Sequence, residues 1–185
     1  MKELIITAKI LIVIGSARKG RVADKITQYV QSDLADRTDT IVTVADLKEI
    51  DLPFFENENS PLSPDYVIND VRVQAWSDMV STADHIVFIT PEYNHSLTAI
   101  QKNAVDSLGT EWIKKSVTAV AYGWTGGSQA VEEFRKVMTK MDSMITPTVA
   151  QLTFMKDLQP DGTLMNEGTA VAQIKNSIDE LQSVA

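Results

Sequence analysis

The amino-acid sequence predicts an α/β protein of three layers, in which helices cover both faces of a five-stranded parallel sheet. Short, nearly continuous apolar segments alternate with segments whose apolar residues recur at helical spacing, and this strand–helix order repeats five times. Strands that are apolar on both faces are typical of parallel sheets with crossover helices. No linker or low-complexity segment interrupts the order, so residues 1–185 are expected to form a single domain.

The first strand–helix unit carries the most informative stretch of the chain. Ile10–Ile14 is an unbroken apolar run, which predicts a buried strand, and it stops at Gly15-Ser16. A helix is expected from Val22 to Leu34. A small-residue turn before a helix start, with free N–H groups and the positive end of the helix dipole, is typical of a phosphate site. An ordinary turn with solvated cations has the same pattern, and both interpretations stay open on this stretch alone.

The other elements follow in chain order. The remaining strands are predicted at Thr40–Ala45, His85–Thr90, Val117–Tyr122 and Thr148–Phe154. A helix is expected from about Asp65, with the apolar residues Val67, Val71, Ala75, Met79 and Val80 on one face and Trp76 inward. The next is expected after Ser96, its predicted N-cap, and stops at Gly109. The last two carry the apolar sets Ala130, Phe134, Val137, Met138 and Met141, and Val171, Ile174, Ile178 and Leu181. Five such units favour the flavodoxin-like strand order 2-1-3-4-5 over a six-stranded dinucleotide fold.

The segment from Asp46 to Pro64 is predicted to be irregular. A loop of this length in a compact domain is usually functional or part of an interface. Two adjacent aromatic residues in it, Phe54 and Phe55, either fold back on the core or contact a ligand or a second subunit. The methionines Met138, Met141 and Met144 follow a mostly helical spacing and are interpreted as core residues, with a subunit interface as the alternative.

The charge distribution indicates the kind of ligand. The chain of 185 residues has a formal net charge of -8, which argues against nucleic acid as a partner. Residues 15–30 differ, because Arg18, Lys19, Arg21 and Lys25 stand there against Asp24 alone, a local net charge of +3 from four minus one. One basic turn in an acidic protein favours a small anionic ligand.

Composition excludes several other kinds of site. The chain has no cysteine, which rules out disulfides, thiolate metal ligands and cysteine nucleophiles. The N-terminal residues 1–6 are apolar, but Thr7 and Lys9 follow without a small-residue cleavage site, so no targeting segment is expected. No run approaches the roughly 20 apolar residues of a membrane span. We expect a cytoplasmic protein that has neither a membrane nor a nucleic acid as partner.

Three predicted loops leave the carboxyl ends of strands near the point where the strand order reverses. They are residues 15–21, 91–96 and 123–127, and each is rich in Gly, Ser or Asn. Ligands of such sheets bind at this point. The first loop suits a phosphate, and the other two suit the edge and face of a flat ring. Together they indicate a mononucleotide, FMN above all.

The same loops carry a family resemblance. The motifs Gly15-Ser16-Ala17-Arg18, Pro91-Glu92-Tyr93-Asn94 and Lys102-Asn103-Ala104-Val105-Asp106 stand in this order, followed by Glu111-Trp112 and Gly126-Gly127. From about Lys9 to Phe154 the chain resembles the NADPH-dependent FMN reductase family, which includes flavin, quinone, azo-dye and chromate reductases. It departs from that family at Arg21, where many members have a second serine, and at Thr98-Ala99 and Gln101, where Pro-Gly and Leu are usual.

The resemblance implies a set of cofactor-binding residues and an activity. It assigns the FMN phosphate to Ser16, Arg18, Arg21 and Val22, the edge of the isoalloxazine to Pro91, Glu92, Tyr93 and Asn94, and its other side to Gly123, Gly126 and Gly127. NADPH or NADH would donate hydride, and a small acceptor such as a free flavin, quinone, azo compound or metal oxyanion would receive it. A homodimer or homotetramer is implied too, with the 46–64 loop as a candidate contributor to the neighbouring site.

No side chain is singled out as catalytic, although Glu92 and His95 are candidates for a direct role. His85 is interpreted as structural, and the two histidines form no metal-ligand spacing with nearby carboxylates. Trp112 and Trp124 are expected between subunits or over the flavin. Whether Arg21 contacts the phosphate or an incoming NADPH is open.

Two other functions share the predicted fold. A flavodoxin-type electron carrier would bind FMN without oxidising NAD(P)H itself, but the cations Arg18 and Arg21 are unusual for its phosphate loop. A response-regulator receiver needs an aspartate at the end of the third strand, where this chain has Thr90-Pro91.

Overall fold

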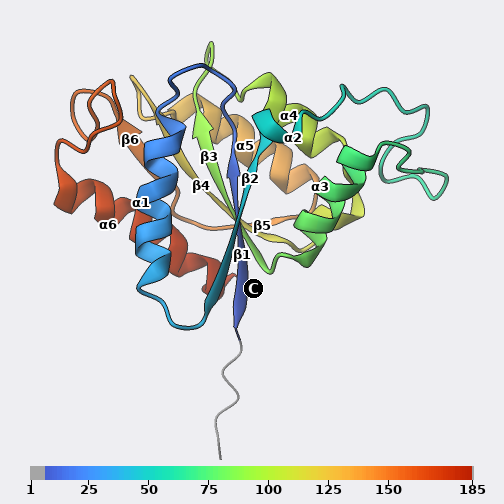
Figure 1. Ribbon diagram of the computed structural model, residues 1–185, viewed down its shortest axis with the longest axis horizontal. Coiled ribbons are helices and arrows are strands. Elements are labelled where there is room, and N and C mark those ends of the chain that lie inside the picture. The colour runs from blue at the N-terminus through green and yellow to red at the C-terminus, as the bar shows by residue number, and fades with distance from the viewer. Residues whose placement is uncertain (1–6, 185) are drawn as a thin grey trace, which may run out of the picture.

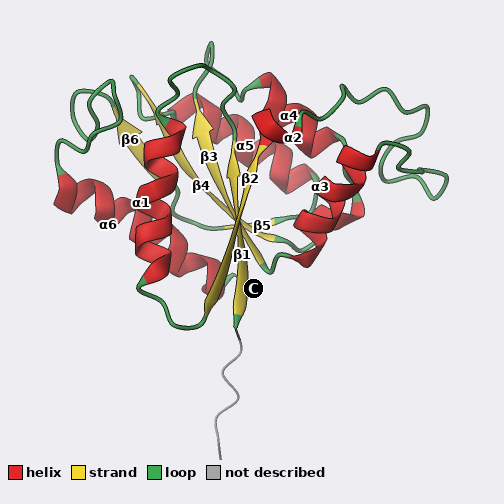
Figure 2. Cartoon of the chain, in the orientation of Figure 1, coloured by secondary structure: helices red, strands yellow, loops and turns green. Residues whose placement is uncertain are grey.

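A parallel sheet forms the centre of the molecule (Figures 1 and 2). The computed structural model describes residues 7–184. The apolar segment 1–6, for which no targeting role is expected, lies outside the described residues. The strands are β1 (Ala8–Ile14), β2 (Thr40–Asp46), β3 (His85–Pro91), β4 (Ser116–Gly123), β5 (Met144–Ile145) and β6 (Ala150–Thr153). Their order is β2-β1-β3-β4-β5, with β6 also paired to β4, and all pairs are parallel. The predicted fold class and strand order are therefore confirmed.

The prediction of five strands missed the short strand β5. It pairs with the start of β4 at Ser116 and Val117, whereas β6 pairs with the end of β4 from Val120 to Gly123. The two short strands therefore follow one another along the same side of β4. The predicted fifth strand is β6, and it begins later than expected because the N–H and hydroxyl of Thr148 both donate to Glu180, each at 2.6 Å.

Helices cover both faces of the sheet, as predicted (Figure 2). They are α1 (Ala23–Ala35), α2 (Leu47–Ile50), α3 (Val71–Thr82), α4 (Ala99–Asp106), α5 (Ser128–Lys140) and α6 (Glu167–Asp179), with 3-10 turns at Thr110–Trp112 and Glu180–Ser183. Helices α1 and α6 lie on one side of the sheet, and α3, α4 and α5 on the other (Figure 1). None of the helices between residues 7 and 184 is long and apolar enough to cross a membrane.

The core consists of two apolar layers because successive strand residues point to opposite faces. Leu11 and Val13 pack in the layer under α3, α4 and α5, whereas Ile10, Ile12 and Ile14 pack under α1 and α6. The first layer contains an aromatic group of Trp76, Phe88, Trp112 and Phe134. Trp112 is fully buried there, so its predicted place between subunits or over the flavin is wrong. The inward position of Trp76 and the core position of Met138 are confirmed.

Two helix starts differ from the sequence prediction. Helix α3 begins at Val71 rather than near Asp65, because the Asp70 side chain accepts a hydrogen bond from the Arg72 N–H at 2.8 Å and caps the helix. Val67, Val71 and Ala75, expected on its buried face, are exposed. Helix α4 is capped by Thr98 and not by Ser96. In the last helix, Val171 is partly exposed while its neighbour Ala170 is buried.

The segment between β2 and α3 is mostly irregular, as predicted, apart from the single turn α2. It extends away from the sheet beyond α3 and α4 (Figure 1). Phe54 is 79% exposed, so it does not fold back on the core, and Phe55 packs on Tyr66 with ring centroids 6.4 Å apart. Residues 53–59 and 65–70 line a cavity of about 550 Å³. None of the residues that the family resemblance assigns to the cofactor lines this cavity.

Candidate functional site

The three loops singled out in the sequence meet at one edge of the sheet, the upper edge in Figure 1. They follow β1, β3 and β4, which are neighbours in the sheet. Ile14 at the end of β1 lies opposite Ile89, and Pro91 at the end of β3 lies opposite Tyr122 near the end of β4. The strand order reverses between β1 and β3, which is where ligands of such sheets bind.

The loop after β1 presents unsatisfied backbone donors ahead of helix α1. Ser16 is buried, while residues 17–20 are exposed. In the part of the chain that the structure describes, the N–H groups of residues 16–22 donate to no protein acceptor. Val22 occupies the N-cap position of α1 without a side-chain hydrogen bond. Free N–H groups at the positive end of a helix are an anion-binding arrangement, as the sequence predicts.

The start of this loop is fixed by residues of α4. The Thr98 hydroxyl donates to the Gly15 carbonyl at 2.6 Å and also accepts from the Gln101 N–H. A Cβ at Gly15 would lie 2.3 Å from the Gln101 Oε1 and 2.9 Å from the Ile89 carbonyl, so only glycine fits. Thr98 and Gln101, the two residues at which the sequence departs from the family pattern here, thus pack directly beneath the loop.

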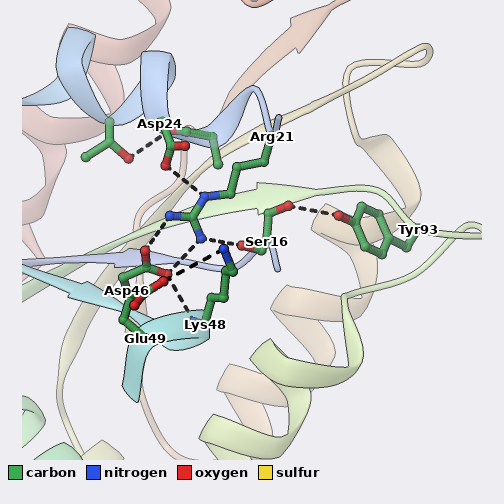
Figure 3. A network of polar contacts seen from close by, with 9 residues as sticks. Ser16, Arg21, Asp24, Asp46, Lys48, Glu49 and Tyr93 are labelled. Atoms are coloured by element: carbon green, nitrogen blue, oxygen red, sulfur yellow. Dashed lines mark hydrogen bonds and ion pairs between the residues drawn. The ribbon is translucent and has the colours of Figure 1, made fainter. Parts of the chain in front are cut away.

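Arg21 is turned toward the end of β2 (Figure 3). Its Nη1 donates to the Asp46 Oδ1 at 2.7 Å and to the Ser16 carbonyl at 2.6 Å, its Nη2 donates to the Asp46 Oδ2, and its Nε donates to the Asp24 Oδ1 at 2.8 Å. Hydrogen bonds to Asp46 raise the pKa of Arg21, against the effect of burial. Burial disfavours the charged carboxylate of Asp46, but hydrogen bonds from Arg21 and the Lys48 N–H keep the pKa of Asp46 below its usual value.

The loop after β3 begins with a tight hairpin. Tyr93 and Ser96 exchange two backbone hydrogen bonds of 3.0 and 3.1 Å. Between them Asn94 and His95 have φ angles of 49° and 64°, the left-handed conformation that a type I′ hairpin turn requires. The Tyr93 hydroxyl lies 2.8 Å from the Ser16 Oγ, which joins this loop to the loop after β1 (Figure 3).

The Glu92 carboxylate joins the second loop to the third. Its Oε2 accepts a hydrogen bond from the Gln129 N–H at 3.0 Å, with the Ala130 N–H at 3.5 Å, and the Thr125 hydroxyl donates to its Oε1 at 3.3 Å. Helix α5 has no capping side chain at Gly127, so Glu92 supplies the acceptor from another strand end. A carboxylate at a helix N-terminus also interacts favourably with the helix dipole.

The turn after β4 depends on its two glycines for packing. Gly126 and Gly127 have φ angles of 70° and 73°. A Cβ at Gly127 would lie 2.9 Å from the Ala121 Cβ and 3.0 Å from the Tyr122 nitrogen. Trp124 at the tip of the turn is 70% exposed and packs edge-on against Phe154, with ring centroids 5.5 Å apart. It is therefore an exposed aromatic residue at the candidate site.

Comparison with known proteins identifies this arrangement. The model of the NADPH-dependent FMN reductase family matches residues 8–158. The chain belongs to this family. It is 31% identical over 175 residues to an NAD(P)H-dependent FMN reductase of Saccharomyces cerevisiae, covering 86% of this chain and 91% of the yeast protein. It is 32% identical over 156 residues to an NAD(P)H-dependent FMN reductase of Schizosaccharomyces pombe, covering 84% and 78%.

More distant relatives agree with this assignment. An FMN-dependent NADPH-azoreductase of Staphylococcus haemolyticus is 27% identical over 141 residues, covering 75% of this chain and 73% of the relative. Among solved structures, the NAD(P)H:acceptor oxidoreductase FerB of Paracoccus denitrificans superposes with a TM-score of 0.74 at 21% identity, covering 96% of this chain and 98% of FerB. That likeness supports the fold, and the resemblance inferred from the loop motifs is confirmed.

The two candidate catalytic side chains of this FMN reductase family member differ in their surroundings. The Glu92 side chain is 11% exposed, whereas that of His95 is 72% exposed. The His95 Nδ1 lies 3.7 Å from the Glu92 Oε1, beyond hydrogen-bond distance. His85 lies apart from the loops, at the start of β3, and its Nδ1 is buried without a partner in the described chain. Among residues 7–184 no group of three or more His, Asp and Glu side chains is placed to hold a metal ion.

Sequence reasoning missed three side chains that shape the site. Asp46 ends β2, Thr98 caps α4, and Tyr122 stands near the end of β4. Burial raises the pKa of Tyr122, whose ring packs on Phe154 with centroids 6.1 Å apart. The signal that could have found Asp46 and Tyr122 is their position, since polar side chains at the carboxyl ends of parallel strands lie at the ligand edge.

Proposed function

We propose that the chain is an FMN-dependent NAD(P)H oxidoreductase, which passes hydride from NADPH or NADH through bound FMN to a small acceptor. The observation that carries the proposal is the joining of the three loops at one edge of the sheet. Ser16 and Tyr93 link the first loop to the second, and Glu92 links the second to the third. An electron carrier would share the FMN site, but the matched family consists of reductases.

The residues present fit the two ends of FMN. We propose that the phosphate binds to the free N–H groups of residues 16–22, with Arg18 as the exposed cation beside them and Ser16 and Val22 lining the cradle. The ring would lie between the hairpin after β3 and the turn after β4. The N–H groups of Asn94, Trp124 and Thr125 donate to no acceptor within residues 7–184 and are available to its polar edge.

The chemistry belongs to the cofactor, since bound FMN accepts a hydride and releases the electrons to an oxidant. The chain's own residues bind and orient. Glu92, Gly126 and Gly127 hold the two ring-facing loops in place, and Pro91 and Gly123 end the strands from which these loops start. Fixed N–H donors would stabilise negative charge on the ring. The Glu92 carboxylate is occupied by the N–H groups of α5, so its role in this proposal is structural. His95, exposed on the hairpin, is free to contact an acceptor.

The proposal extends to the setting of the enzyme. We propose a single FMN-binding domain over residues 1–185, located in the cytoplasm and assembled as a homodimer or homotetramer, with free flavin, a quinone, an azo compound or a metal oxyanion as acceptor. The acidic composition and the absence of cysteine support the cytoplasmic location. The exposed side chains of the 46–64 loop, Phe54 at 79%, support contact with a second subunit.

One experiment tests the central proposal. The purified protein is supplied with FMN and desalted, its absorption spectrum is recorded, and NADPH or NADH is then added without oxygen. We expect protein-bound flavin bands that bleach on addition and steady NAD(P)H oxidation once a quinone is supplied. The absence of bound flavin would refute the FMN site. Bound flavin without NAD(P)H oxidation would instead identify an electron carrier.

A further inference from the structure

Arg21 uses most of its hydrogen-bonding capacity inside the protein. A guanidinium has five N–H donors. Four hydrogen bonds join that of Arg21 to Asp24, Ser16 and both oxygens of Asp46. The Arg21 side chain is 10% exposed and that of Asp46 is 20% exposed. Two carboxylates therefore surround one guanidinium, so this group of three side chains has a net charge of -1.

The contacts of Arg21 connect the end of β2 to the site loops (Figure 3). Asp46 is itself held in place, because its Oδ1 caps α2 through the Lys48 N–H at 3.0 Å. From Asp46 the connection runs through Arg21 to the Ser16 carbonyl, and from the Ser16 hydroxyl to Tyr93. The Ser16 peptide lies between Gly15, held by Thr98, and the exposed residues 17–20. Arg21, at the end of the loop, thus holds the beginning of the loop at Ser16, and the free N–H groups lie between these two points.

We propose that Arg21 is a positioning residue of the phosphate loop rather than a phosphate ligand, and that Asp46 controls FMN affinity through it. This inference rests on the proposed FMN function. An arginine at this place in the sequence suggests a direct charge contact with phosphate. In the geometry observed, the Arg21 guanidinium pairs with the carboxylates of Asp46 and Asp24. The phosphate is then left to the backbone N–H groups and to Arg18.

The two roles predict opposite effects of removing the Asp46 charge. If Arg21 bound phosphate, Asp46 would compete for it, and Asp46→Asn would free the guanidinium and remove a nearby negative charge, so FMN would bind more tightly. If Arg21 positions the loop, Asp46→Asn breaks the two-pronged carboxylate contact and releases Ser16, so FMN binds more weakly. Riboflavin has the ring without the phosphate, so a change in FMN affinity that riboflavin affinity does not share is a change in the phosphate loop and not in the rest of the site.

The test measures FMN and riboflavin affinities by flavin fluorescence for the wild type, Asp46→Asn, Arg21→Gln and the double variant. We expect each single variant to weaken FMN binding about tenfold, as for loss of a charge-assisted pair, with riboflavin affinity changed less than about twofold. The double variant should equal the single variants, because both remove one connection. Asp24→Asn is the graded comparison, since Asp24 makes a single contact with Arg21 and is 55% exposed, so its loss should weaken FMN binding less than Asp46→Asn does.

Arg21→Lys gives an independent answer, including the case in which Asp46→Asn fails to fold. Lysine binds phosphate as a point charge but cannot make the two-pronged carboxylate contact. Retained FMN affinity in Arg21→Lys, tighter FMN binding in Asp46→Asn, or equal losses for FMN and riboflavin would each overturn the inference. Failure of the wild type to bind FMN would refute the proposed function instead.

Discussion

Replacing Glu92 tests whether its carboxylate is a structural cap or a catalytic group. Glu92→Ala removes the acceptor for the Gln129 N–H and the contact with Thr125, and leaves the first turn of α5 uncapped. Loss of a helix cap costs about 1 kcal/mol, and a hydrogen bond to a charged group contributes roughly 1.5–3 kcal/mol. Since the Glu92 side chain is only 11% exposed, we expect a loss of about 2 kcal/mol in the free energy of unfolding. For a chain of this length that lowers the Tm by about 4–8 °C.

The measurement is thermal and urea unfolding of the protein without flavin, so that cofactor binding does not enter. Glu133→Ala is the matched control, because Glu133 pairs with exposed Lys136 on the same helix and its loss should cost less than about 1 kcal/mol. Glu92→Gln keeps an oxygen for the cap and should lose less stability than Glu92→Ala and keep most of the wild-type turnover. Equal stability of Glu92→Ala and Glu133→Ala would refute the capping role. A stable Glu92→Gln enzyme without turnover would instead support a catalytic role for the Glu92 carboxylate.

Three further predictions concern stability and acceptor use. Burial lowers the pKa of His85 from 6.5, so the unfolded state binds a proton more readily than the folded state does. The stability that neutral His85 contributes is therefore complete above pH 6.5 and is lost as the pH falls through the folded pKa. Urea midpoints at pH 5 and pH 8 should then differ more in the wild type than in His85→Leu. Gly127→Ala should lose about 1–3 kcal/mol, measured by urea unfolding, because φ is 73° and the new Cβ meets β4. Trp124→Ala should change stability by less than about 0.5 kcal/mol yet raise the KM for a planar quinone several-fold, with little change for a small metal oxyanion.

The sequence predicted the strands best where both faces are buried. In β1, β3 and β4 nearly every residue is buried, so each is a short, nearly continuous apolar run, and the turn residues that follow it favour a strand over a helix. Strand β5 has two residues, Met144 and Ile145, and such a segment has no period to detect. Its pairing follows from the turn after α5, where the Asp142 carbonyl accepts from the Lys114 N–H at 2.7 Å, and the Met144 N–H then donates to the Lys115 carbonyl just before β4 at 2.9 Å.

Helix starts were harder to predict because hydrogen bonds outside the helices decide them. The Asn57 side chain donates to the Val67 carbonyl at 2.9 Å, and that of Asn59 donates to the Asp65 carbonyl at 3.1 Å. These bonds hold residues 65–67 outside α3 although their apolar spacing continues that of the helix. At α4, Thr98 is preferred to Ser96 because Ser96 is already paired with Tyr93 in the hairpin. At α3 the competing partners lie 10 and 6 residues earlier in the chain. At α4 the competing contact is a local backbone pair that closes a hairpin.

The same limit applies to the electrostatics of the candidate site. Counted along the chain, residues 15–30 carry a net charge of +3. The structure places Asp46 beside Arg21 and Asp161 beside Lys25. With Asp24 included, four cations then stand against three carboxylates, and the net charge of the group is +1. A sequence window cannot include these carboxylates, because parallel strands and the last turns bring them from 25 and 136 residues away. The remaining positive charge lies at Arg18 and Lys19, both exposed and therefore screened by solvent. In the proposed FMN site, recognition of a doubly charged phosphate would then depend chiefly on oriented N–H groups, and the contacts that orient the loop are expected to set the affinity.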